Sequence, residues 1–282
     1  VTGSATALLA EDNKDVLDSA KCTVDKFTLS APATETLVAD ATKLAALNGF
    51  NLGGFDFEVK GAIADLIKSD NEDAVALATA IAVTDEDPVL AADAAKLYRL
   101  NPTAIPTDLA ISDSVDELLA ADAEAVVKAA AKAGTLTFAD DATLTVDQAL
   151  TFSEWTDGDL SALLNADATL TIQGSGADLL ENADAFAGAT DIEITSATVA
   201  EAAEIYGWSE DYDIKVDKIA DSAAALLSEE DVLSAEDVVL YLSGTDNEVS
   251  VADLTTLIGL IGGDADSLVN ADLNIEAGAT LV

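Results

Sequence analysis

Carboxylates are the most abundant side chains in this sequence that could take part in chemistry. The 282 residues include 54 Asp and Glu against 12 Lys and Arg, which gives a formal net charge of −42. Carboxylate oxygens are the ligands that hard cations such as Ca²⁺ take in proteins. We therefore consider calcium as a cofactor. We treat no pair of acids as a catalytic site on its own, because such pairs arise throughout a chain of this composition.

Residues 244–253 hold the first group of candidate calcium ligands, which are Asp246, Glu248 and Asp253. This run resembles a dockerin-like or EF-type loop that leads into a helix. It departs from that pattern because the first and third ligand positions fall on Leu242 and Gly244. A helix cap explains Asp253 equally well, because short acceptor side chains bind the free N–H groups at a helix start.

Two further features could bind ligands. Asp157 and Asp159 flank Gly158 and form a second candidate calcium loop, for which a plain turn is the alternative interpretation. Trp155 and Trp208 could stack on sugar rings, which makes carbohydrate a second ligand class. Packing inside the fold is the alternative role for both Trp side chains.

The sequence lacks the side chain that most often acts as a catalytic base. It contains no His and a single Cys, Cys22. Without imidazole there is no Ser-His-Asp triad, no Cys-His pair and no His metal ligand. Cys22 has no partner for an internal disulfide, and we interpret it as a buried thiol rather than a nucleophile. We therefore predict that the protein is not an enzyme.

The charge also restricts the partners. DNA, RNA and anionic membranes would repel a surface of this sign. The longest apolar stretch, residues 257–261, is far too short to cross a bilayer, so we expect no membrane insertion. An acidic surface suits a salty or calcium-rich exterior, and we expect a secreted or cell-surface protein. The chain opens at Val1 and contains no Met, so we expect a processed chain or a segment of a longer one.

The acids lie among short apolar segments that alternate with polar residues, the pattern of β-strands. The first five segments start 28, 26, 28 and 27 residues apart, and later spacings run from 22 to 34. An additional strand is expected at 144–146. The predicted strands are residues 27–29, 55–57, 81–83, 109–111, 136–138, 170–172, 192–194, 214–216, 240–242 and 273–275.

Residues 109–134 show the repeated unit most clearly. After the strand, Asp113 and the serines beside it can cap a helix start. Val115, Leu118 and Leu119 then fall at i, i+3 and i+4, on one helix face. Gly134 ends a second helical run, since Gly tolerates the left-handed conformation that follows many helices.

Strand, helical return and next strand together make a crossover, which parallel strands require. Self-similarity at this spacing is typical of solenoids. We predict an α/β repeat solenoid with parallel strands, short Ala/Leu-rich helices and a period of about 26 residues, forming a single elongated domain over residues 1–282. An ordinary globular α/β domain is the alternative. Because open sheet edges invite pairing, we expect self-association, or further repeats of the same chain, through the termini.

The units LAISDSVDELLA, IKVDKIADSAAALL and IAVTDEDPVLAADAAKL resemble repeats of very large bacterial secreted and cell-surface proteins. Those arrays, found in cyanobacteria and proteobacteria, run as an apolar strand, Ser/Thr-Asp, a small residue, an Ala pair, Leu-Leu and an Ala-rich helix. The resemblance implies an extracellular repeat protein. The companion Gly-Gly-x-Gly-x-Asp repeat is missing here, so its mode of calcium binding is not implied.

These observations lead to one predicted function and its alternatives. We expect a non-catalytic structural protein of the cell exterior, such as a surface layer, an adhesin stalk or a filament segment. A calcium- or carbohydrate-binding surface module is the alternative, and a phage appendage protein would share the same composition.

Overall fold

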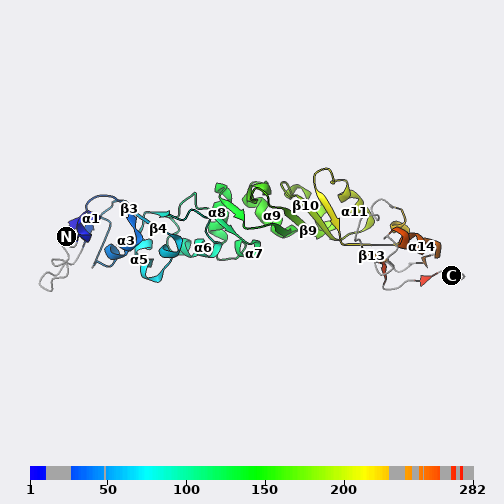
Figure 1. Ribbon diagram of the computed structural model, residues 1–282, viewed down its shortest axis with the longest axis horizontal. Coiled ribbons are helices and arrows are strands. Elements are labelled where there is room, and N and C mark those ends of the chain that lie inside the picture. Colours follow the sequence, from blue (N-terminus) through cyan, green and yellow to red (C-terminus); the bar gives the residue numbers. More distant parts are fainter. Residues whose placement is uncertain are drawn as a thin grey trace. The chain divides into compact units, whose positions relative to one another are not determined.

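The computed structural model describes residues 1–10, 27–47, 49–228, 239–242, 248–249, 251–260, 268–270 and 274–275. The chain divides into two compact units, Val1–Ala139 and Asp140–Val282 (Figure 1). Cys22 and Asp246, two residues singled out in the sequence, lie outside the described residues.

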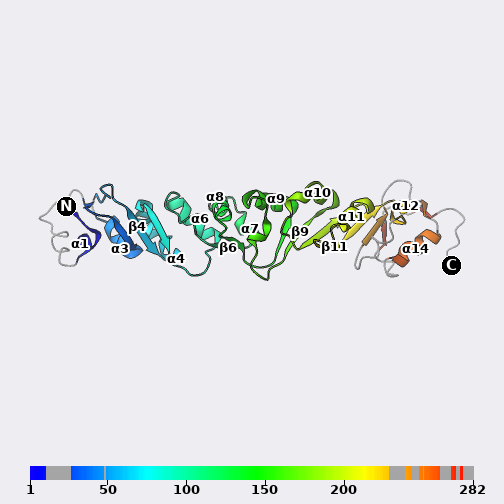
Figure 2. The same ribbon diagram turned by 90° about the horizontal axis from the view of Figure 1, so that it is seen from above.

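In the first unit, short strands alternate with helices of at most ten residues. Three parallel sheets, β1–β2, β3–β4–β5 and β6–β7, contain all its described strands. Helix α3 packs against β3 and β4 (Figure 2). The elements are β1 (Thr2–Gly3), α1 (Ala5–Leu9), β2 (Thr28–Leu29), β3 (Ala33–Leu37), α3 (Val38–Ala45), β4 (Phe57–Gly61), α4 (Ile63–Leu66), the 3-10 helix η1 (Ser69–Asn71), α5 (Glu72–Leu77), β5 (Ala80–Val83), α6 (Ala91–Leu100), β6 (Ile111–Asp113), α7 (Val115–Leu118), α8 (Glu124–Ala133) and β7 (Leu136–Phe138).

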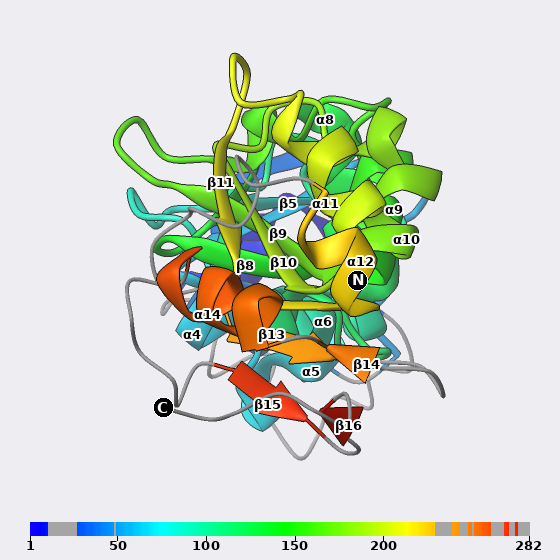
Figure 3. The same ribbon diagram turned by 90° about the vertical axis from the view of Figure 1, so that its right-hand side faces the viewer.

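The second unit repeats this plan around a four-stranded sheet of order β11-β10-β9-β8. Figure 3 shows α10 and α11 on one side of that sheet. Two smaller parallel sheets, β12–β13–β15 and β14–β16, follow. The elements are β8 (Ala142–Thr145), α9 (Val146–Trp155), η2 (Leu160–Leu163), β9 (Leu170–Ser175), α10 (Gly176–Glu181), η3 (Ala183–Ala185), β10 (Asp191–Ser196), α11 (Val199–Tyr206), β11 (Asp213–Val216), β12 (Lys218–Asp221), α12 (Ala223–Leu226), β13 (Val239–Leu242), β14 (Glu248–Val249), α14 (Val251–Leu260), β15 (Leu268–Asn270) and β16 (Asn274–Ile275).

The predicted α/β class with parallel strands is confirmed. The sequence also predicts that the strands are neighbours in one elongated sheet, and this is wrong, because the described strands form six separate sheets. Spacing between paired residues also varies. Val59 pairs with Ile81 and Ile192 with Ile214, each 22 positions further on, whereas Leu144 pairs with Ile172, 28 positions further on.

Small side chains let the helices approach the sheets closely. In α6 the buried residues are Ala91, Ala94, Ala95 and Leu97, and in α8 they are Val126, Val127, Ala130 and Ala131. Gly134 ends α8 with a positive φ of 71°, as the sequence predicts. The helices thus bury an Ala-rich stripe, which explains how a core with few aromatic residues forms.

Within the described residues, no helix combines the length and the apolar character needed to cross a membrane.

Candidate functional site

The candidate calcium residues take ordinary structural positions where the structure describes them. Asp157 and Gly158 form a turn with positive φ values of 54° and 95°. The Asp159 carboxylate accepts hydrogen bonds from Ser161 N at 3.0 Å and from Ser161 Oγ at 2.6 Å, and so caps η2. This geometry is that of a capped turn, the alternative that the sequence left open.

The second candidate loop is described only in part. Glu248 belongs to β14, and Asp253 lies in the first turn of α14 with its side chain partly buried. Across the described ranges, no three Asp, Glu, Cys or His side chains are grouped so that they could hold a metal ion. Calcium binding therefore stays a prediction that rests on the sequence.

The two Trp side chains differ in exposure. Trp155 is 3% exposed and packs edge-to-face on Phe152, with ring centroids 5.3 Å apart. It is a core residue and is not accessible to a sugar. Trp208 is partly buried and contacts Tyr212 edge-to-face at 6.4 Å.

Two tyrosines near Trp208 have perturbed ionisation. Burial raises the pKa of Tyr206, whose buried Oη has no hydrogen-bond partner among the described residues. Burial and the negative charge of Asp211 raise the pKa of Tyr212. Both shifts favour the protonated phenol, so neither residue provides a base at neutral pH.

The most regular polar feature is a carboxylate that joins each of three helices to the following strand–helix unit. Asp85 Oδ2 accepts a hydrogen bond from Ile63 N at 2.7 Å. Asp113 Oδ2 accepts from Ala91 N at 3.1 Å, and Asp221 Oδ2 accepts from Val199 N at 3.2 Å. In each case the donor is the first residue of a helix and the acceptor lies 22 positions later in the chain.

Two of these carboxylates also bind their own turn. Asp113 Oδ1 accepts from Ser114 N at 2.8 Å, and Asp221 Oδ1 accepts from Ser222 N at 2.7 Å. One side chain therefore orders the end of its own strand and the start of the preceding helix. We call Asp85, Asp113 and Asp221 the bridging carboxylates.

The bridging carboxylates supply caps that some helices lack. Helices α4 and α6 follow Ala62 and Leu90, which have no side-chain acceptor. A helix start leaves free N–H groups that must be satisfied, and a carboxylate there also interacts favourably with the helix dipole. Asp85 and Asp113 provide this acceptor from the following unit.

Hydroxyl groups make similar connections at the starts of strands. Thr79 Oγ1 accepts from Phe57 N at 2.7 Å and lies 3.2 Å from Phe57 O. Thr190 Oγ1 repeats this arrangement with Leu170, at 2.9 Å from N and 3.1 Å from O. Both threonines come immediately before a strand, β5 and β10, so the beginning of each of these strands is tied to the preceding strand.

Asn101 is the buried polar residue of the described core, at 6% exposure. Its Nδ2 donates to Val75 O at 2.9 Å and to Ala78 O at 2.7 Å. Its Oδ1 accepts from Thr103 Oγ1 at 3.0 Å. Because buried amides are costly unless they are hydrogen-bonded, this residue fixes the position of the 101–104 segment against the preceding unit.

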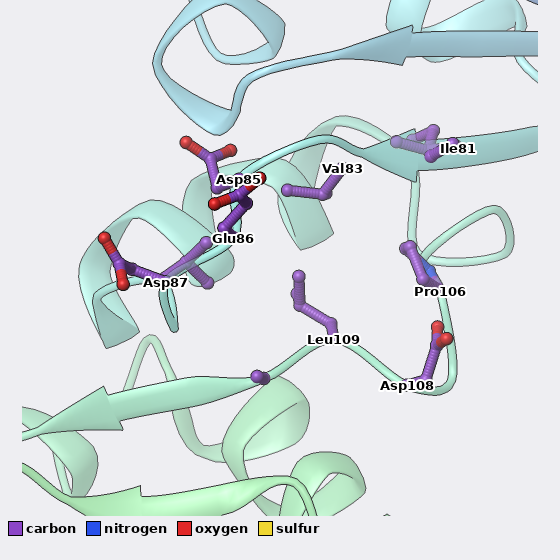
Figure 4. Close-up of a pocket in the computed structure, with 11 residues that line it drawn as sticks. Ile81, Val83, Asp85, Glu86, Asp87, Pro106, Asp108 and Leu109 are labelled. Carbon is purple, nitrogen blue, oxygen red and sulfur yellow. The ribbon is translucent and has the colours of Figure 1, made fainter.

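An acid-rimmed pocket of about 370 Å³ lies between β5 and the segment that leads into β6. Figure 4 shows Val83 and Leu109 pointing into it, with Asp85, Glu86 and Asp87 on one side. Asp108 lies on the opposite side. This pocket was not predicted from the sequence, because it forms where two strands separate.

The sequence contains a signal for the bridging carboxylates. Each is the Asp of a Ser/Thr/Ala-Asp pair, at the last residue of its strand or two residues beyond it. At Asp113 the sequence predicts a cap for the next helix, α7, but within the described chain that helix has no side-chain cap hydrogen bond. The Asp113 carboxylate instead reaches back to the preceding helix, a contact that sequence spacing alone does not specify.

In comparisons with known proteins, the chain matches no protein-family model and no curated protein.

Proposed function

We propose that this protein is a non-catalytic structural protein of the cell exterior, in which strand–helix units stack as a solenoid. The proposal rests on the three bridging carboxylates. Each joins two successive strand–helix units across the same interval of 22 residues. Equivalent contacts at equal spacing are typical of repeat proteins, in which each unit gains its stability from its neighbours.

The polar side chains are used in a way that supports a scaffold. Several polar side chains each hold one strand–helix segment against a neighbouring one. The hydrogen bonds of Asp113, Thr79 and Asn101 are examples. Catalytic sites instead need a base and a nucleophile in mutual contact. The proposed roles are a surface layer, an adhesin stalk or a filament segment, with further protein in contact with the terminal units.

The acidic surface supports an exterior location. A net charge of −42 keeps such a surface hydrated and is screened by the salt of an external medium. Calcium or carbohydrate binding remains the alternative function, with Trp208 as a partly exposed aromatic residue that a sugar could reach.

Antibody labelling of intact cells tests this proposal. An antibody raised against the folded chain should label the outside of unpermeabilised native cells or the structures attached to them. As the control, an antibody against a cytoplasmic protein should label the cells only after they have been permeabilised. Labelling that depends on permeabilisation would contradict the proposal.

A further inference from the structure

The hydrogen-bonded ladder is interrupted between β5 and β6. Ile81 N donates to Ala104 O at 3.0 Å, and Val89 pairs in parallel with Ile111. Between these two contacts the chain segments separate around the acid-rimmed pocket (Figure 4).

The second unit shows the same connection in a closed form. Asp217 N donates to Ile194 O at 2.9 Å, and Ala197 N donates to Lys218 O at 3.0 Å. Backbone hydrogen bonds there continue from one strand pair to the next. The opening in the first unit is therefore a local departure from the plan that both units share.

Strand β5 presents an unpaired edge to the opening. Thr84 N donates to Gly61 O in β4 at 3.0 Å. Successive residues of a strand direct their backbone groups to opposite sides, so Val83 directs its N–H away from β4 and toward the pocket. Within the described residues this N–H has no hydrogen-bond partner. An unpaired edge of this kind accepts an added strand.

The walls of the pocket combine apolar and acidic side chains. Val89 and Leu109 are buried and form apolar parts of the lining. Glu86, Asp87 and Asp108 are exposed, and within the described chain they have no ion-pair or hydrogen-bond partner. Among the described residues that line the pocket there is no Lys or Arg. The complementary occupant has an extended backbone and cationic side chains.

We propose that the β5 edge binds an extended segment of a partner protein that carries Lys or Arg at alternating positions. The segment adds as a strand beside Val83 and directs its cationic side chains to Glu86, Asp87 and Asp108. A second copy of this chain does not fit the requirement, because it carries 12 cationic residues against 54 acidic ones and would be repelled.

A labelled hexapeptide of sequence Lys-Val-Lys-Val-Lys-Val, capped at both ends, is the probe. It should bind the full chain saturably in about 0.15 M NaCl, where screening acts over about 8 Å. Hydrogen exchange at the Val83 amide should slow by about tenfold or more in the complex, since the amide becomes hydrogen-bonded. The same peptide with Glu in place of Lys should not bind.

Two variants test the two parts of the site. Val83→Pro removes the free N–H at an edge position, where Pro is tolerated. Glu86→Gln/Asp87→Asn/Asp108→Asn removes the rim charge. Each should raise the peptide Kd by about tenfold or more. The matched control, Asp184→Asn/Glu204→Gln/Asp211→Asn, makes the same change in net charge in the second unit and should leave the Kd within about threefold.

The outcomes separate the alternatives. Equal weakening by the two triple variants would mean diffuse attraction and would overturn the proposal. Unchanged binding by a folded Val83→Pro variant would rule out strand addition. Slower exchange at Val83 with calcium chloride alone, together with no peptide binding, would assign the pocket to a cation and also overturn the proposal.

Discussion

At the scale of single residues, the bridging carboxylates determine how one unit holds the next. Asp113 accepts hydrogen bonds from Ala91 N and Ser114 N, which belong to the starts of two different turns. Its removal leaves two backbone N–H groups without their acceptor. The effect should therefore extend to α6, although Asp113 is distant from that helix in sequence.

Asp113→Ala should lower the free energy of unfolding by about 1–2 kcal/mol, the usual cost of losing a helix cap. Hydrogen exchange should also become faster in the first turn of α6. Denaturant titration and exchange mass spectrometry measure the two effects. Asp140→Ala, a change at an exposed residue, is the control and should stay within about 0.5 kcal/mol. A loss confined to residues next to Asp113 would contradict the bridging role.

At Tyr206, a substitution should not destabilise the protein, in contrast to the loss expected at Asp113. Its buried Oη has no hydrogen-bond partner in the part of the chain that the structure describes, so Tyr206→Phe should leave the free energy of unfolding at pH 7 unchanged or raise it by up to about 1 kcal/mol. The pKa of Tyr206 is raised in the folded protein, so this residue's contribution is present below the unfolded-state pKa of about 10 and is lost as pH rises above it.

As the pH rises from 7 to above 10, the Tyr206→Phe variant should therefore lose less free energy of unfolding than the parent protein. Denaturant titrations at both ends of that interval measure the difference. A marked loss of stability at pH 7 would show that the hydroxyl makes a stabilising hydrogen bond, contrary to this account.

At the scale of elements, glycines at strand ends let each strand lie close to the preceding helix. A Cβ added at Gly174 in β9 would lie 2.7 Å from Val146 Cγ2, at the first residue of α9. Gly61 in β4 has the same relation to Val38, at 3.0 Å. The two units thus use the same contact between a strand and the helix before it.

Gly174→Ala should lower the free energy of unfolding by about 1–3 kcal/mol, because the added methyl group overpacks this contact. Val146→Ala in the same chain should recover part of the loss, which a double-mutant cycle measures. Gly259→Ala is the control: it lies inside α14 with no atom within 4 Å of the new Cβ, and it should stabilise by up to about 1 kcal/mol. Additive effects of the first two changes would contradict direct packing.

Sequence patterns predict elements well where burial alternates. In β7, Leu136 and Phe138 are buried on either side of a partly exposed residue, and the strand has the predicted bounds. Strand β3 was missed because four of its five residues are not buried, which leaves no alternation to detect. In β4 the strand starts at Phe57 rather than at residue 55, because Phe55 is exposed while Phe57 and Val59 are buried.

The polar contacts between units are harder to predict. The Asp and Ser at the end of a strand predict a helix start, and α7 and α12 do begin directly after Ser114 and Ser222. The side-chain cap expected for α7 is not formed among the described residues. Which other helix a carboxylate reaches depends on the parallel register, and the sequence does not state it. The acid-rimmed pocket was missed for the same reason, because it forms where that register is interrupted.

At the scale of the whole molecule, the excess of negative charge is the main influence on how stability depends on salt. With a net charge of −42, the folded chain repels itself, and added NaCl should raise the melting temperature by screening. If the 244–253 segment binds calcium, CaCl₂ should raise it further at equal ionic strength, and Asp246→Asn should remove the excess. Thermal melts in the two salts measure this. Coincident melting curves of the unchanged protein in the two salts would contradict the calcium prediction. Charge screening would then account for the whole effect of salt.

We propose that successive strand–helix units are equivalent and stack by repetition. Deleting residues 192–213 removes 22 positions, one full interval between paired strands β10 and β11, and joins Asp191 to Ile214. In a solenoid the remaining units should still pack, and cooperative unfolding should persist at reduced stability. Deleting only residues 203–213 breaks the interval and is the control.

Circular dichroism with denaturant titration of both deletion variants is the most direct test. We expect the 22-residue deletion variant to keep its secondary structure and a cooperative transition, and the shorter deletion to disrupt the second compact unit. If the 22-residue deletion unfolds that unit as completely as the shorter one, the units are not interchangeable and the solenoid proposal is wrong.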